Sequence, residues 1–178
     1  MPTYIAFLRA INVGGRFIKM ADLRAGLSHV GFGDVESQIQ SGNLRFSSSL
    51  RSAAKVEMAV EVALQDLCGF TVRTIVRTPA QLSGLTSYGA GLKTPAEGDV
   101  RRYVTFLKDD PDDAFVAAMN GWDIAGEWAH VKDREVYVWF AHPSHEAKLS
   151  NVRIERGGVV ATTRDWKVVS TLAEKWGG

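Results

Sequence analysis

The predicted secondary-structure elements occur twice along the chain in the same order, which limits the folds that the chain can adopt. Residues 3–8 form a continuous apolar run typical of a buried strand, and residues 20–30 place apolar side chains at helical spacing. Alternating apolar and polar residues on both sides of residues 41–43 predict a hairpin. The remaining elements of the first half are a helix ending before Gly69, a strand at residues 72–77 and a helix from Thr78, where Pro79 and Gln81 complete a helix start.

The second half repeats this order after a connector predicted at residues 84–99, which hold four glycines and one proline. Its predicted elements are a strand at residues 102–107, a helix opened by the acidic residues 109–113, a hairpin over 128–140, a helix from about 144, a short strand at 159–161 and a last helix. Both halves therefore have the order strand, helix, strand, strand, helix, strand, helix.

This order predicts an α+β fold of two tandem ferredoxin-like (βαββαβ) halves with mainly antiparallel sheets. In that motif the helices cover one face of the sheet and leave the other face free. We place the halves at residues 1–89 and 90–178 of one compact unit, and infer a duplication from the shared element order, without clear sequence identity between the halves.

Composition and charge narrow the class of protein. The 178 residues are 46% hydrophobic and 23% charged, which is ordinary for a globular chain, and the net charge of +1 argues against a general nucleic-acid coat protein or a polybasic membrane binder. No apolar stretch approaches the ~20 residues of a membrane span, and the N-terminus has no signal-peptide pattern. We therefore expect a cytoplasmic protein that does not bind membranes.

Familiar catalytic and cofactor motifs are missing from the sequence. It contains no glycine-rich dinucleotide fingerprint, phosphate-binding P-loop, nucleophile elbow or zinc-protease motif. His142, His145 and Glu146 are the only cluster of metal-ligand types, and Pro143 at a predicted helix start makes structural roles the better interpretation, so we predict no metal site. No cofactor or catalytic residue is assigned.

The first candidate segment follows the first strand and contains Arg9, Asn12, Gly14, Gly15 and Arg16. Consecutive glycines allow backbone N–H groups to turn toward a ligand, and the two arginines supply donors suited to phosphate or carboxylate. The alternative is a connecting loop in which the glycines only meet left-handed backbone angles.

The second candidate segment is the first hairpin turn, with Gln40, Ser41 and Asn43. Gln40 and Asn43 are candidates for neutral hydrogen-bonding contacts to a ligand, although all three residues are also ordinary in turns. Ser41 has no local His or Lys partner, so a nucleophilic role is disfavoured.

The third candidate segment joins the last strand to the last helix and contains Thr163, Arg164 and Trp166. Thr162 and Asp165 fit a capping box, which predicts Arg164 in the first helical turn. A cation there opposes the helix dipole unless it meets an anion, so we predict a phosphate or carboxylate clamp. Trp166 either stacks on the ligand or packs on the apolar stripe of the last helix.

These segments also carry a resemblance to a known family, the bacterial conserved hypothetical proteins grouped as domain of unknown function sixteen-ninety-seven. The family pattern has Asn at the position of Asp165 and a Lys near Arg16. The resemblance implies two ferredoxin-like halves and no particular reaction. The residues that carry it are 8–15 (Leu-Arg-Ala-Ile-Asn-Val-Gly-Gly), 39–43 (Ile-Gln-Ser-Gly-Asn) and 161–166 (Ala-Thr-Thr-Arg-Asp-Trp).

The leading hypothesis is a protein that binds a small anionic ligand of nucleotide type between its halves, with the three segments converging in space. One alternative is a single-stranded nucleic-acid binding module that uses Tyr103, Tyr137 and Trp139 as stacking platforms, which the near-neutral charge disfavours. The others are an enzyme acting on a phosphorylated metabolite and a protein-interaction module without catalysis. The sequence sets no oligomeric state.

Overall fold

The computed structural model describes residues 1–178, which divide into two compact units. The first unit comprises residues 1–83 and 172–178, and the second comprises residues 84–171. Two helices, α3 (Pro79–Gly91) and α6 (Trp166–Trp176), contribute residues to both units.

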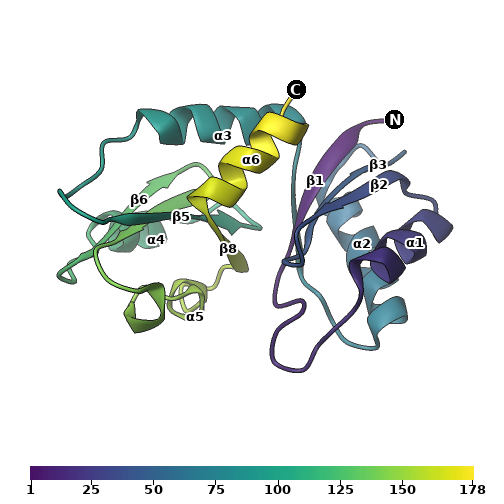
Figure 1. The fold of residues 1–178 in the computed structure, drawn as a ribbon, viewed down its shortest axis with the longest axis horizontal. Coiled ribbons are helices and arrows are strands. Elements are labelled where there is room, and N and C mark those ends of the chain that lie inside the picture. The colour runs from purple at the N-terminus through teal and green to yellow at the C-terminus, as the bar shows by residue number, and fades with distance from the viewer. The chain divides into compact units, whose positions relative to one another are not determined.

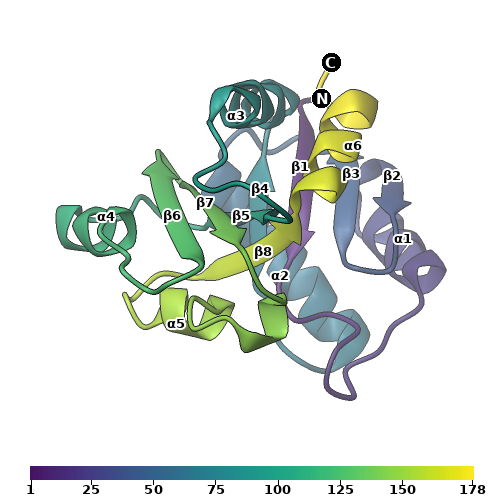
Figure 2. The ribbon, with the colours of Figure 1, turned by 60° about the vertical axis from the view of Figure 1, so that its left-hand side comes forward.

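The first unit is built on a four-stranded antiparallel sheet in the order β2-β3-β1-β4 (Figure 2). Apolar residues of β1, β3 and β4 form its core with the helices α1 and α2, which lie on one face of the sheet (Figure 1). The C-terminal turn joins this unit, since Trp176 Nε1 donates to Glu36 Oε2 at 3.2 Å. Its elements are β1 (Thr3–Leu8), α1 (Met20–His29), β2 (Gly33–Gln38), β3 (Asn43–Ser47), α2 (Ala53–Cys68) and β4 (Thr74–Arg77).

The second unit has a matching antiparallel sheet in the order β6-β7-β5-β8. Its elements are β5 (Arg101–Leu107), α4 (Asp113–Asn120), β6 (Glu127–Lys132), β7 (Glu135–Phe140), a 3-10 turn η1 (Ser144–Glu146), α5 (Asn151–Glu155) and β8 (Ala161–Asp165). The chain is thus α+β, with two similar halves that each contain a four-stranded antiparallel sheet, and the element order predicted from the sequence is confirmed.

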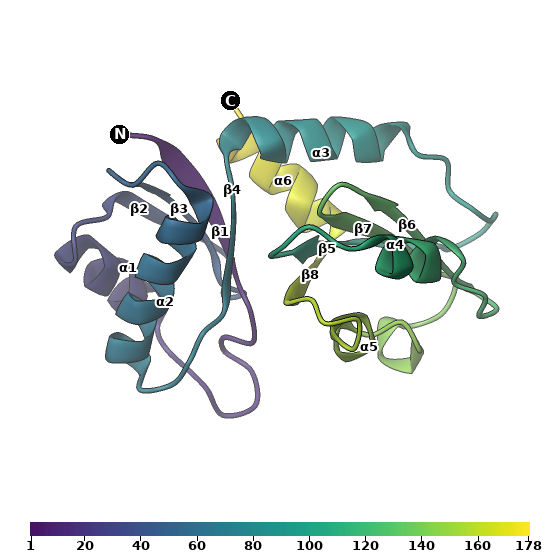
Figure 3. The same cartoon turned by 180° about the vertical axis from the view of Figure 1, so that it is seen from behind.

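Both faces of the second sheet are covered by helices (Figure 3). Residues of α4 and α5 pack against Val136, Val138 and Phe140 on one face. On the other face, the Tyr137 hydroxyl donates to the Leu85 carbonyl of α3 at 2.7 Å. The expected free sheet face is therefore wrong for this unit, because the helix that follows β4 packs on it.

Three local predictions differ from the structure. The connector at residues 84–99 is shorter than predicted, because α3 continues to Gly91 from a start that the Thr78 and Gln81 side chains cap reciprocally, at 2.9 and 3.2 Å. The helix predicted from residue 144 is a 3-10 turn followed by α5, which Ser150 caps by accepting from Arg153 N. The short strand at residues 159–161 is instead β8, which runs on to residue 165.

None of the helices has the length and apolar character that a membrane span requires.

Candidate functional site

The loop between β1 and α1 folds back on itself as a miniature hairpin. Arg16 N donates to Val13 O at 3.1 Å, and Asn12 N donates to Arg16 O at 2.8 Å. Gly14 and Gly15 sit at the two central positions with φ of 58° and 83°, as a tight turn of this hand requires. The two glycines therefore serve the turn directly, and a Cβ at either position would meet no atom within 4 Å.

Asn12 joins this loop to the first hairpin turn. Its Oδ1 accepts from Ile18 N at 2.8 Å and its Nδ2 donates to Gln40 O at 3.1 Å. A second link is the bond from Leu8 N to Gly42 O at 2.8 Å. Two of the three candidate segments therefore meet within the first unit, and the Asn12 amide is occupied in holding them together.

Backbone strain is concentrated where these two segments meet. Ala10, Asn12 and Ile39 have φ of 55°, 56° and 54°, and they are three of the five residues other than glycine with positive φ in the chain. A β-branched residue such as Ile39 is a genuine outlier in this region. Conformations of this kind persist only where the surrounding structure enforces them, and they cluster at functional sites.

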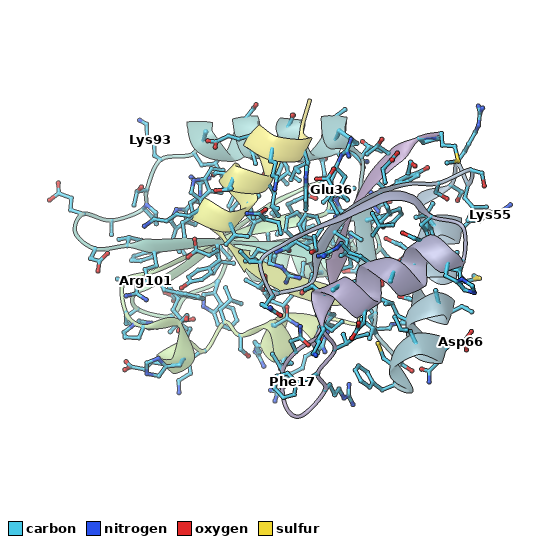
Figure 4. All side chains as sticks on the ribbon, turned by 45° about the vertical axis from the view of Figure 1, so that its right-hand side comes forward. Phe17, Glu36, Lys55, Asp66, Lys93 and Arg101 are labelled. Carbon is cyan, nitrogen blue, oxygen red and sulfur yellow. The ribbon has the colours of Figure 1, made fainter.

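A surface pocket of about 660 Å³ lies beside the joined segments. It combines an aromatic ring, a cation, a carboxylate and two amides, and Figure 4 shows Phe17 on the loop that precedes α1. The sequence patterns did not single out Phe17 or Lys19, although a cation directly before a predicted helix was an available signal for Lys19. The lining residues are Asn12, Phe17, Ile18, Lys19, Asp22 and Gln40.

Two charged side chains of this pocket lie at the start of α1. Lys19 is the N-cap residue of α1 and makes no capping bond with its side chain, so a cation stands at the positive end of the helix dipole. Asp22 in the first turn offsets part of that field. Arg16 is exposed, with its guanidinium carbon 5.5 Å from the centre of the Phe70 ring, and Arg9 donates its backbone N–H to Arg73 O at 2.8 Å.

The other turn residues have mainly internal contacts. Asn43, predicted in the turn, is instead the fully buried first residue of β3, and its Nδ2 donates to Ser41 Oγ at 2.9 Å and to Gln38 O at 3.3 Å. Gln40 is exposed. Gln40 is therefore the residue of this turn whose side chain is best placed for a ligand.

The third segment lies in the second unit and is extended instead of helical. Arg164 belongs to β8, so the predicted place in a first helical turn and the capping box of Thr162 with Asp165 are wrong. Asp165 instead caps the following turn, accepting from Lys167 N at 2.8 Å. The physical reason is that pairing with β5 continues through residue 165, where Tyr103 is the partner.

Thr163 and Arg164 point to opposite faces of this sheet, as successive residues of a strand do. Thr163 Oγ1 bonds Thr105 Oγ1 at 2.8 Å and donates to Asn151 Oδ1 at 3.2 Å. Arg164 is buried, and its guanidinium donates to Thr162 Oγ1 at 2.8 Å and to Thr163 O at 2.9 Å. Burial lowers the pKa of Arg164 to about 10.

Trp166 packs within the second unit, where its ring centre lies 3.8 Å from the guanidinium carbon of Arg102.

The residues proposed as a nucleic-acid platform do not form one. Tyr137 and Trp139 are 1% and 4% exposed, and Tyr103 lies against Phe140, at 5.5 Å between ring centres. Stacking on nucleotide bases requires open rings, which Tyr137 and Trp139 do not offer.

Comparison with known proteins identifies the family to which this sequence is related. The model of the family described as protein of unknown function (DUF1697) matches residues 1–137. The chain belongs to this family. The DUF1697 match includes the 9–16 loop and the 39–43 turn and ends before β8, so the third segment lies outside it.

A solved structure supports the same fold over the whole chain. It is described as the conserved bacterial protein SP0830 from Streptococcus pneumoniae, with a TM-score of 0.74 and 21% sequence identity, covering 100% of this chain and 99% of the other. At this identity the likeness shows the fold alone. No curated protein matches the chain.

Proposed function

We propose that this DUF1697 chain binds a small anionic ligand, a phosphate or carboxylate of nucleotide type, at the pocket between the 9–19 loop and the 39–42 turn. The observation that carries the proposal is the strained junction of the two segments, which presents Lys19 and Gln40 at one pocket. Strain at Ala10, Asn12 and Ile39 costs stability, and a binding role accounts for its place in the molecule.

The chemistry of the pocket fits an anion held at its α1 side. The Lys19 ammonium is exposed and supplies three donors, and the first N–H groups of α1 have no side-chain cap to satisfy them. A phosphate or carboxylate there would meet both the cation and the helix dipole. Arg16, exposed on the same loop, adds to the positive field.

Thr163, Arg164 and Trp166 stay predicted as ligand-binding residues. Their support is the composition of the junction between β8 and α6, because an arginine beside hydroxyl side chains can donate to a phosphate or carboxylate.

We further infer that each half is ferredoxin-like and that the halves arose by duplication. Support for this comes from the corresponding strand orders, β2-β3-β1-β4 and β6-β7-β5-β8, together with the repeated element order.

The test is a thermal-shift series with inorganic phosphate, sugar phosphates, nucleotides and dicarboxylates. A ligand at 100 times its Kd stabilises the folded state by about 2.7 kcal/mol, which is easily measured. We expect stabilisation of the wild type that is lost in Lys19→Gln and kept in Lys55→Gln, an exposed lysine on α2 in the same unit. Loss in Arg164→Met as well would support a role of the third segment in binding.

A lack of response to every anion would contradict the proposal and favour the protein-interaction module. The enzyme alternative has no observation of its own, because the pocket carries one carboxylate, Asp22, and no histidine. Nucleic-acid binding is disfavoured by the burial of Tyr137 and Trp139.

A further inference from the structure

We propose that the ligand of this pocket is a mononucleotide, with its base stacked on Phe17, its phosphate at Lys19 and its ribose at Asp22. This inference rests on the proposed function, since it names the class of anion that the same pocket takes.

Phe17 is the first observation. Its side chain is 72% exposed, whereas the next residue, Ile18, is partly buried and packs against the core of the first unit. The loop is therefore anchored by Ile18 and directs Phe17 outward, onto the wall of the pocket. The nearby Arg16 guanidinium lies over Phe70, so Phe17 is left without that cation as a partner. An exposed, anchored aromatic ring at a pocket is a stacking surface for a base.

The mixed charge of the lining is the second observation. A site for inorganic phosphate alone would present donors only, yet Asp22 lines the pocket together with Lys19. Lys19 is the extended N-cap residue of α1 and Asp22 lies in the first turn, so both charges stand at the same end of the helix. A carboxylate accepts hydrogen bonds from hydroxyl groups, as the acidic residue of dinucleotide sites does with the ribose. Lys19 and Asp22 together suit a phosphate with a sugar attached.

The amide and the size of the pocket complete the match. The Gln40 side chain offers both a donor and an acceptor, which fits the hydrogen-bonding edge of a base. A volume of about 660 Å³ falls within the range of sites for small organic ligands and is large for an inorganic anion. The Phe17 ring therefore corresponds to the face of the base and the Gln40 amide to its edge. The Asp22 carboxylate corresponds to the ribose, and the Lys19 ammonium corresponds to the phosphate.

The experiment measures Kd by titration calorimetry for the four ribonucleoside monophosphates, ribose 5-phosphate and inorganic phosphate. Stacking on one ring strengthens binding by about 5- to 150-fold, so at least one monophosphate should bind more tightly than ribose 5-phosphate by that factor. Phe17→Leu should remove this preference while leaving the Kd of ribose 5-phosphate unchanged, and Phe17→Trp should retain it. Tyr88→Leu, at an exposed ring in the second unit, is the matched control.

The outcomes separate this inference from the proposed function. Equal affinity for the monophosphates and ribose 5-phosphate, with both lost in Lys19→Gln, would overturn the mononucleotide assignment and leave the anion site standing. Equal weakening of ribose 5-phosphate and the monophosphates by Phe17→Leu would also overturn it, since the ring would then serve only the shape of the loop. Absence of binding by every phosphate compound would overturn both.

Discussion

The side chain of Asn12 bonds the backbone of two segments at once, accepting from Ile18 N at 2.8 Å and donating to Gln40 O at 3.1 Å. Asn12 and Gln40 are 28 positions apart in the sequence. Asn12 does this from a left-handed conformation, with φ of 56°. Asparagine tolerates that region better than most residues. It therefore suits both the left-handed backbone conformation and the two hydrogen bonds at this position.

We expect Asn12→Ala to destabilise the chain by about 2–4 kcal/mol, because it removes two hydrogen bonds and puts alanine in a left-handed conformation that asparagine tolerates better. Asn12→Gly loses the same bonds without the conformational cost and should be less damaging. Urea unfolding monitored by tryptophan fluorescence measures both free energies of unfolding.

Asp133, at the tip of the β6–β7 hairpin with φ of 53°, is the control for this pair. It is exposed, so Asp133→Ala should report mainly the conformational cost, about 1–2 kcal/mol. If Asn12→Ala cost no more than Asp133→Ala, the two Asn12 bonds would contribute nothing measurable.

Ile39 has the most unfavourable of the strained conformations, because its φ is 54° and its side chain is branched at Cβ. Ile39 is 51% exposed, so only part of its apolar surface is buried and lost on substitution. Ile39→Asn should therefore stabilise the chain by about 1 kcal/mol. Ile124→Asn is the matched control, since Ile124 is 42% exposed and has no positive φ. Differential scanning calorimetry should show a higher Tm for the first variant only, and a lower Tm for Ile39→Asn would show that its side-chain contacts outweigh the strain.

Sequence patterns predicted the elements well where the cause is local. The capping box of Thr78 with Gln81 and the end of α2 at Gly69 depend on residues within one or two turns, and both are present. The order of strands and helices followed for the same reason, because periodicity within each segment reports which face is buried.

Predictions failed where distant residues decide the local structure. Thr162 to Asp165 have the composition of a helix start, yet pairing with β5 keeps them extended. Two of the six residues that line the pocket, Asn12 and Gln40, were predicted. The bonds of the Asn12 side chain to Ile18 N and Gln40 O bring the two segments together, and no local pattern encodes them.

Gly89 explains why a glycine-rich segment was mistaken for a connector. A Cβ at this position would lie 2.7 Å from atoms of both Trp166 and Tyr137, so close packing of α3 requires glycine there. Gly89→Ala should cost about 1–3 kcal/mol through overpacking, despite the better helix propensity of alanine.

Gly84 on the same helix is the matched control, because a Cβ there would meet no atom within 4 Å. Gly84→Ala should stabilise the chain by up to about 1 kcal/mol. Opposite signs in urea unfolding are the expected result, and stabilisation by both variants would show that the Trp166 ring moves aside freely.

The buried charge of Arg164 predicts a dependence of stability on alkaline pH. Desolvation lowers its pKa to about 10 in the folded chain, whereas the unfolded chain keeps the higher ordinary value. Between these values the unfolded state binds more protons than the folded state, so this residue makes stability rise with pH above about 10. Tyr137 acts in the opposite direction, since burial raises the pKa of its hydroxyl and stability falls as pH rises through the ordinary tyrosine value.

The contribution of Tyr137 cancels when the free energy of unfolding of Arg164→Met is subtracted from that of the wild type. We expect that difference to be constant up to about pH 9 and then to shift in favour of the wild type, as measured by urea unfolding from about pH 8 to 11. A flat difference across this range would show that Arg164 keeps its proton in the folded chain, as a guanidinium paired with an anion does.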